Sequence, residues 1–191
     1  MKICFLDNSL IPYTYNDLNS KNIRGGENIV IHLSNELSKL GNNIDVFNNC
    51  KDTAIINNVK WSNINKADKN LIYDIAFTNN DIRLFDKIIA KKYVAFSHSI
   101  QSIEKFIRKR QLTSYLKYKP KIVILGNYHN KNRNYLLKLF GTINLQWAVD
   151  PLFLETKLDE TLIENRAIFT SRRDRNLDIL IKIWREKIFP I

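Results

Sequence analysis

The stretch that decides the fold is IRGGENIVIHLSNELSKLGNNIDVF, residues 23–47. Its apolar residues recur at the spacing of an amphipathic helix: Ile29, Val30, Leu33, Leu37 and Leu40. Gly41 follows the last of them, where helices commonly end, and the apolar segment 43–49 then predicts a strand. With another apolar strand predicted at 2–6, these segments form a β-α-β unit, which implies parallel strands and a right-handed crossover.

The alternation of strands and helices continues as far as residue 150. Further strands are predicted at 59–64, 73–79, 93–98, 121–127 and 142–149. Helices are predicted between them, at 81–91, 101–117 and 130–140. The strands are apolar throughout, which is typical of parallel sheets covered on both faces. The sequence therefore predicts a doubly wound, Rossmann-like α/β domain over residues 1–150.

A second segment starts after this domain. Residues 151–165 are predicted to be a linker, and residues 166–191 begin with the apolar strand AIFTS and continue into an amphipathic helix over 177–188. The apolar stripe of that helix must fold back onto the first domain, be covered by a partner chain or a second copy, or stay exposed. We interpret this segment as the first strand and helix of a second domain that the chain does not complete.

Charge narrows the classes of partner. The net charge is +11, and hydrophobic residues make up 45% of the chain, enough for a packed core. Residues 101–140 hold ten lysines and arginines against the single Glu104, a net charge of +9. This basic window suits nucleic acid, an anionic membrane surface or a phosphorylated small molecule, and it equally suits a lysine-rich solvated face.

The cysteines and the hydropathy pattern indicate a cytoplasmic protein. Cys4 and Cys50 lie in predicted strand contexts and in no metal-ligand spacing, so buried reduced thiols are expected and no metal site is predicted. No signal peptide is recognisable, and no stretch approaches the roughly 20 apolar residues of a membrane span. Peripheral membrane contact through the basic window 101–140 remains compatible with this localisation.

The candidate site residues follow the predicted strands, because ligands of open α/β sheets bind outside the carboxyl ends of the strands. Gly25 and Gly26 permit positive φ and close approach to a phosphate at the helix start, or they serve only a loop-to-helix turn. Glu27 suits the helix dipole. His98 can exchange a proton or bind a sugar hydroxyl or phosphate, or simply cap the strand. Other strand-end residues are Asn79, Asn80, Ser99, Asn127 and Asp150.

The order of these motifs resembles the retaining GT-B glycosyltransferases of family 4. The resemblance is carried by MKICFLD, GGENIVIHLSNELSKLGNNIDVF, AFSH and LQWAVDPLFL. Members of that family have Gly-Gly-x-Glu before an apolar helix, a histidine at a strand end, and Asn-Gly-Val-Asp-x-x-x-Phe at the domain junction. Val149 and Asp150 match the junction, whereas Trp147 and Ala148 replace Asn-Gly. The segment FTSRRDRNLDILIKIWREKIFP is similar to the opening of the family's donor-binding domain.

The resemblance implies roles for particular residues. Arg175 falls where the family has a cation at the donor diphosphate, and Arg172 matches the preceding arginine. His98 would lie near the transferred sugar. The remaining residues expected to bind donor or acceptor are Gly25, Gly26, Glu27, Asn127 and Asp150.

By resemblance, the function is transfer of a hexose from a nucleotide-sugar donor to a glycan, lipid-linked or polysaccharide acceptor, without a further cofactor. The family's acidic E-x(7)-E motif belongs downstream of Ile191, so the chain is expected to be inactive alone. The alternative is a non-catalytic α/β binding module that uses residues 101–140 for a polyanion such as nucleic acid.

Overall fold

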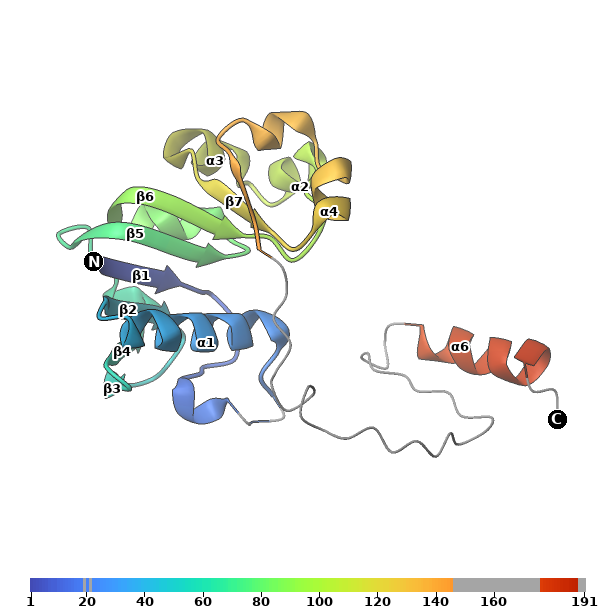
Figure 1. Ribbon diagram of the computed structural model, residues 1–191, viewed down its shortest axis with the longest axis horizontal. Helices are drawn as coiled ribbons and strands as arrows, with labels where there is room; N and C mark the ends of the chain where they lie inside the picture. Colours follow the sequence, from blue (N-terminus) through green and yellow to red (C-terminus); the bar gives the residue numbers. More distant parts are fainter. Residues whose placement is uncertain (19, 21, 146–175, 189–191) are drawn as a thin grey trace. The chain divides into compact units, whose positions relative to one another are not determined.

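The computed structural model describes residues 1–18, 20, 22–145 and 176–188 (Figure 1). The chain divides into two compact units, Met1–Trp147 and Ala148–Ile191. The expected linker 151–165 and the expected strand AIFTS lie outside the described residues.

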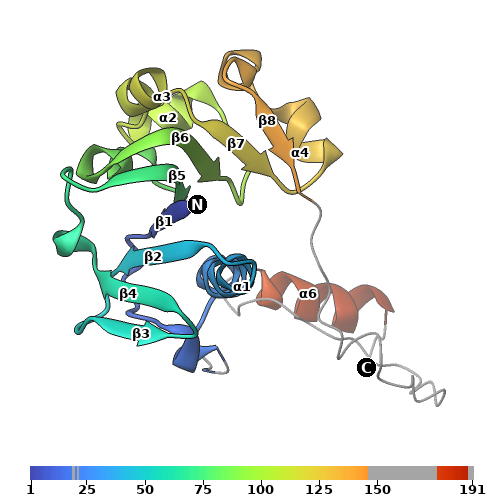
Figure 2. The same ribbon diagram turned by 60° about the vertical axis from the view of Figure 1, so that its left-hand side comes forward.

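An eight-stranded sheet forms the centre of the first unit, with strand order β3-β4-β2-β1-β5-β6-β7-β8 (Figure 2). The strands are β1 (Lys2–Leu6), β2 (Asn43–Asn48), β3 (Ala54–Ile56), β4 (Val59–Asn63), β5 (Ile72–Asn79), β6 (Ile89–Phe96), β7 (Lys121–Ile124) and β8 (Thr142–Asn144). Neighbouring strands pair in parallel except β3 and β4, which are antiparallel. The predicted α/β class with a largely parallel sheet is confirmed.

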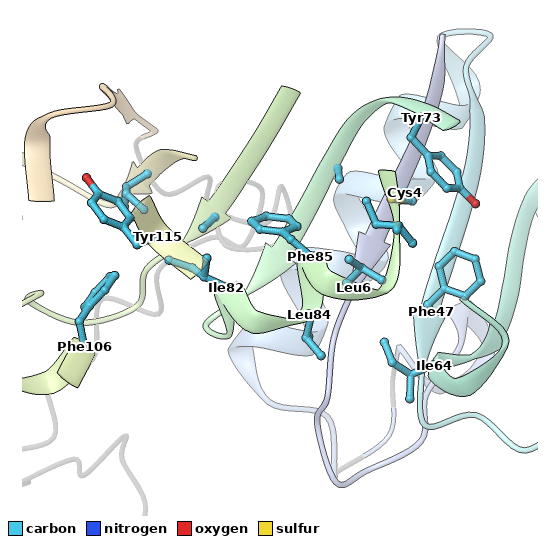
Figure 3. Close-up of a cluster of buried hydrophobic side chains, with 14 of the residues drawn as sticks. Cys4, Leu6, Phe47, Ile64, Tyr73, Ile82, Leu84, Phe85, Phe106 and Tyr115 are labelled. Carbon is cyan, nitrogen blue, oxygen red and sulfur yellow. The ribbon is translucent and has the colours of Figure 1, made fainter. Parts of the chain in front are cut away.

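Helices cover both faces of the sheet, as a doubly wound fold requires. The helix α1 (Gly25–Lys39) packs on one face, where Val30 and Ile31 join a cluster with Ile3 and Phe5 of β1. The other face carries the 3-10 helix η3 (Ile82–Lys87), α2 (Ile103–Arg108), α3 (Leu112–Tyr118) and the 3-10 helix η4 (Tyr135–Lys138). Successive β1 residues alternate between the faces, so Cys4 and Leu6 belong to this second cluster (Figure 3).

The helix predicted from the opening stretch is present, and Ile29, Val30, Leu33 and Leu37 of the expected stripe pack in or against a core cluster. Val30 and Ile31 are buried together with Ser34 and Ser38, and Leu40 is 77% exposed at the end of the helix. Gly41 has a φ of +80°, so it ends the helix in the left-handed conformation that glycine favours.

The helix predicted at 81–91 is wrong. Residues Ile82–Lys87 form a 3-10 helix, and the chain is already extended in β6 from Ile89 onward. Ile82, Phe85 and Ile88 are buried at a spacing of three, which matches the roughly three residues per turn of a 3-10 helix. The same spacing mimics an amphipathic α-helix in the sequence.

The single helix predicted at 101–117 is also wrong, because the chain breaks into α2 and α3. Phe106 and Tyr115 are both buried, with ring centroids 5.5 Å apart. At about 100° per residue, an unbroken helix would place two residues nine positions apart on opposite faces. The turn through Arg110, with a φ of +54°, brings both rings into one cluster.

Smaller differences concern the ends of elements. The helix predicted at 130–140 is replaced by α4 (Asn127–Asn132) and η4, separated by the extended Arg133. The strand predicted at 121–127 ends at Ile124, and the structure describes β8 only over Thr142–Asn144. Two further short 3-10 helices were not predicted, η1 (Tyr15–Asp17) and η2 (Ile64–Lys66).

The strand predicted at 59–64 is β4, but its hairpin partner β3 was missed. Asn57 and Asn58 connect the two strands with φ values of +52° and +60°. Two consecutive positive φ angles are characteristic of a type I′ turn, whose twist suits a two-residue hairpin. The Asn-Asn pair was therefore the available signal.

The second unit is described only over residues 176–188. The helix α6 (Leu177–Ile183) continues into a π-helical turn over Trp184–Ile188, which confirms the helical prediction for 177–188. Its exposed isoleucines are Ile179, Ile181, Ile183 and Ile188. Of these residues, Ile181 and Ile188 belong to the predicted apolar stripe, and how that stripe is covered stays a prediction.

Candidate functional site

The candidate site lies at the carboxyl ends of three neighbouring strands. β1 lies between β2 and β5. The strands that follow β1 in the chain are first added on the β2 side of the sheet, and from β5 onward they are added on the opposite side, so the strand order reverses at β1. Ligands of doubly wound folds bind at such a reversal of strand order. Asp7 follows β1, Asn79 ends β5, and His98 comes two residues after β6.

Asp7 is the most buried acid of this site, with 2% of its surface exposed. Its carboxylate accepts hydrogen bonds from the Tyr13 hydroxyl at 2.6 Å, the Ser9 backbone N–H at 3.0 Å and Asn79 Nδ2 at 3.2 Å. Burial raises the pKa of Asp7, the three hydrogen bonds oppose that rise, and the nearby Glu27 adds to it. The carboxyl group is thus held in one position by two donors from the loop after β1 and one from β5.

Asn79 fixes the orientation of His98. Because a carboxylate only accepts hydrogen bonds, Asn79 must direct its NH2 group toward Asp7. Its Oδ1 then faces His98 Nε2 at 2.7 Å, so Nε2 is the donor in this hydrogen bond. Burial lowers the pKa of His98, although the negative charges of Asp7 and Glu27 act in the opposite direction. The lowered pKa favours the neutral form of the imidazole.

Glu27 joins the site from the first turn of α1. Its side chain is buried, and its Oε1 accepts a hydrogen bond from the Ser9 hydroxyl. Asn49 Nδ2 donates to the backbone carbonyl of Ser9 at 2.6 Å. The loop after β1 is therefore tied to α1 on one side and to the end of β2 on the other.

The two glycines at the start of α1 have different roles. A Cβ atom added at Gly26 would lie 2.9 Å from Asn79 Nδ2, whereas one added at Gly25 would meet nothing within 4 Å. The expectation of positive φ at this pair is wrong, since Gly41 and Gly141 are the glycines of the described residues with positive φ. Gly26 is instead required by the close approach of the helix start to Asn79.

This difference predicts opposite results for two matched substitutions. Gly26→Ala is expected to lower the free energy of unfolding by about 1–2 kcal/mol, because Asn79 must move away from Asp7 and His98. Gly25→Ala is expected to leave stability unchanged or raise it by up to about 1 kcal/mol, because alanine favours the helix. Urea denaturation of both variants measures the contrast. Equal stability of the two variants would refute the proposed packing of Gly26 against Asn79.

The structure brings together some of the predicted site residues and not others. Gly26 and His98 both lie against Asn79, Glu27 lies against the same loop as Asp7, and Gly25 begins the helix. Asn127 instead begins α4 after β7, where its Oδ1 accepts a hydrogen bond from Asn144 Nδ2 at 3.2 Å. The remaining predicted residues, Asp150, Arg172 and Arg175, lie outside the described residues.

Three residues of the site were missed in the sequence, namely Asp7, Ser9 and Tyr13. Asp7 had a clear signal, because it directly follows the apolar strand KICFL and the strand-end rule applies to it as well. Tyr13 had none, since its hydroxyl reaches back to Asp7 from an irregular loop.

The described part of the chain contains neither a cluster of metal-binding side chains nor a helix that could cross a membrane. In residues 1–18, 20, 22–145 and 176–188, no three or more His, Cys, Asp or Glu side chains gather closely enough to hold a metal ion. The helices over those residues are all too short or too polar to cross a membrane. Cys4 and Cys50 are buried free thiols, as predicted, and burial raises the pKa of both.

We found no protein family, no characterised protein and no solved structure that matches this chain. The function is therefore inferred from the residues of the candidate site.

Proposed function

We propose that the chain is the acceptor-side part of a nucleotide-sugar-dependent glycosyltransferase and that sugar hydroxyls bind at the carboxyl ends of β1, β5 and β6. The observation that supports this most directly is the hydrogen-bonded series Asp7–Asn79–His98, against which Gly26 places the start of α1. Sites of this kind, at the reversal of strand order, are where doubly wound folds bind small molecules.

The chemistry of these groups suits a polyhydroxylated ligand. A sugar hydroxyl both donates and accepts hydrogen bonds, and the carboxylates of Asp7 and Glu27 supply acceptors beside the amide of Asn79 and the imidazole of His98. A neutral imidazole can also take up a proton when a hydroxyl becomes a nucleophile. In the proposed reaction a hexose passes from a nucleotide-sugar to a glycan, lipid-linked or polysaccharide acceptor, and Arg172 and Arg175 bind the donor diphosphate, as the sequence resemblance implies.

The nucleic-acid alternative receives less support from the side chains of the basic window. Non-specific binding of single strands uses aromatic rings on which bases stack, next to a basic groove. Phe106 and Tyr115 are buried in the core, and Tyr118 and Phe140 pack against the same cluster. Most aromatic rings of residues 101–140 therefore stabilise the fold.

Ligand-observed NMR on the 191-residue chain tests the proposal. Saturation transfer to hexosides and nucleotide-sugars is expected, and His98→Ala is expected to weaken it. His32→Ala is the matched control, because His32 is exposed on α1. Absence of saturation transfer to every hexoside and nucleotide-sugar would refute a sugar site, and so would an equal effect of the two histidine substitutions.

A further inference from the structure

An open groove of about 510 Å³ lies beside the candidate site. The residues that line it come from the loop after β1, the start of η3 and the C-terminal end of α2: Asn8, Asn80, Asp81, Arg83, Arg108, Lys109, Arg110 and Gln111. Asn8 follows Asp7 in the chain, and Asn80 Nδ2 donates to Asn79 Oδ1 at 3.3 Å. Two residues of the groove lining, Asn8 and Asn80, are therefore direct chain neighbours of Asp7 and Asn79.

The single acid of the groove is already neutralised. Asp81 accepts hydrogen bonds from Arg83 Nε at 2.9 Å and Arg83 Nη2 at 2.7 Å, and from Asn8 Nδ2 at 2.8 Å. Burial alone would raise the pKa of Asp81, but the hydrogen bonds and charge of Arg83 outweigh burial and lower it. The carboxylate of Asp81 thus pairs with Arg83. The positive charges of Arg108, Lys109 and Arg110 have no counter-charge among the residues that line the groove.

Arg108, Lys109 and Arg110 are three consecutive exposed cations, and within the described residues they form no ion pair. Their effect reaches Lys105, whose pKa is lowered by burial and by the charges of Lys109 and Arg108. An anion in the groove would relieve this repulsion between like charges.

The backbone at Arg110 does not explain the choice of arginine. The Gln111 N–H donates to the Phe106 carbonyl and the Arg110 N–H donates to the Ile107 carbonyl, which together form the Schellman motif at the end of α2. The residue at position 110 adopts a φ of +54°, a conformation in which glycine is the most favourable residue. Replacing Arg110 by glycine therefore removes the side chain without a backbone penalty.

We propose that this groove binds a phosphoryl group, in the form of a phosphate or diphosphate ester. Guanidinium groups form paired hydrogen bonds with phosphate oxygens, and two arginines with a lysine between them match the charge of a diphosphate. The side-chain amides of Asn8 and Asn80 add neutral polar groups on the groove wall. The groove is lined by other residues than Arg172 and Arg175, so the proposal goes beyond the donor contacts of the proposed transferase.

The left-handed conformation of Arg110 gives a test in which loss of binding cannot be confused with loss of folding. Arg110→Gly is expected to raise Tm by about 2–4 °C, because glycine suits this backbone. The same substitution is expected to weaken binding of inorganic pyrophosphate about tenfold or more, because one charged hydrogen-bonding group is lost. Calorimetric titration with pyrophosphate and thermal unfolding of the full chain measure the two effects.

Lys119→Gly is the matched control. Lys119 follows α3 with a φ of +48°, is exposed and lies outside the groove lining. Its replacement removes one positive charge and relieves the same backbone conformation, yet pyrophosphate affinity is expected to stay within about twofold of the parent chain, apart from long-range charge effects. Equal losses in the two variants would refute a specific groove, and so would an absence of pyrophosphate binding to the parent chain.

Two further titrations identify the source of the phosphoryl group. Vesicles of phosphatidylcholine with phosphatidic acid that bind the chain, release it on addition of pyrophosphate and bind Arg110→Gly more weakly would show that the groove takes a lipid phosphate. Pyrophosphate binding without vesicle binding would show that it takes a soluble ester. Binding to a random single-stranded oligonucleotide that both substitutions weaken equally, with no pyrophosphate competition, would overturn the proposal in favour of a nucleic-acid surface.

Discussion

Replacing Asp7 with alanine is expected to lower the free energy of unfolding by about 2–3 kcal/mol. The substitution removes the shared acceptor of the Tyr13 hydroxyl, the Asn79 amide and the Ser9 N–H, and it leaves buried donors without a partner. Loss of the repulsion between Asp7 and Glu27 offsets only a part of this effect. Urea denaturation measures the change, and the proposed sugar binding should be lost as well, because Asn79 no longer has a fixed orientation.

Asp52→Ala is the control for this substitution. Asp52 is exposed on the loop before β3, so its replacement is expected to change stability by no more than about 0.5 kcal/mol. If Asp7→Ala were as stable as Asp52→Ala, the hydrogen bonds to Asp7 could not be what holds the ends of β1 and β5 together.

Replacing Trp61 with alanine is expected to have the largest effect on stability, about 3–5 kcal/mol. Trp61 is fully buried on β4, and its ring packs edge-on against Tyr13 at 6.0 Å between centroids. The substitution removes a large apolar side chain and leaves a cavity beside the tyrosine whose hydroxyl binds Asp7. The site is therefore expected to lose rigidity together with the core.

Trp61→Phe separates the effect of the cavity from the effect of losing the indole N–H. Within the described residues Trp61 Nε1 has no hydrogen-bond partner, so phenylalanine keeps most of the apolar contact and removes an unpaired donor. A loss of about 1 kcal/mol or less is expected, since shape and volume change only in part. A loss as large as that of Trp61→Ala would contradict both the absence of a partner for the indole N–H and the dominant role of the cavity.

The sheet could be predicted because its signals are local. The apolar runs of β1, β2 and β5 read directly as buried strands, and the helix that ends at Gly41 has a clear period and a clear stop. The break between α2 and α3 could not be predicted in this way, because it depends on Phe106 and Tyr115 meeting in one cluster. That contact is a property of the folded core, and the periodicity of the sequence does not contain it.

The candidate site was predictable to the same extent. The rule that ligands bind at strand ends led to Asn79 and His98, and it applies equally to Asp7, which follows β1. The role of Gly26 could not be predicted from the sequence, because it depends on the distance between the start of α1 and the Asn79 side chain on β5. The paired glycines that look like a phosphate loop in the sequence are, in the structure, one glycine in open space and one that Asn79 requires.

The hydrogen bonds around Asp7 also bear on how tightly a ligand can bind. Asp7 and Asn79 each have several partners within the protein, so their rotamers are selected when the chain folds. Immobilising a free side chain at a binding surface costs about 0.5–1.5 kcal/mol of conformational entropy. A ligand that reaches this edge of the sheet meets side chains that have already lost that freedom, so its affinity is set by its own contacts and its own flexibility.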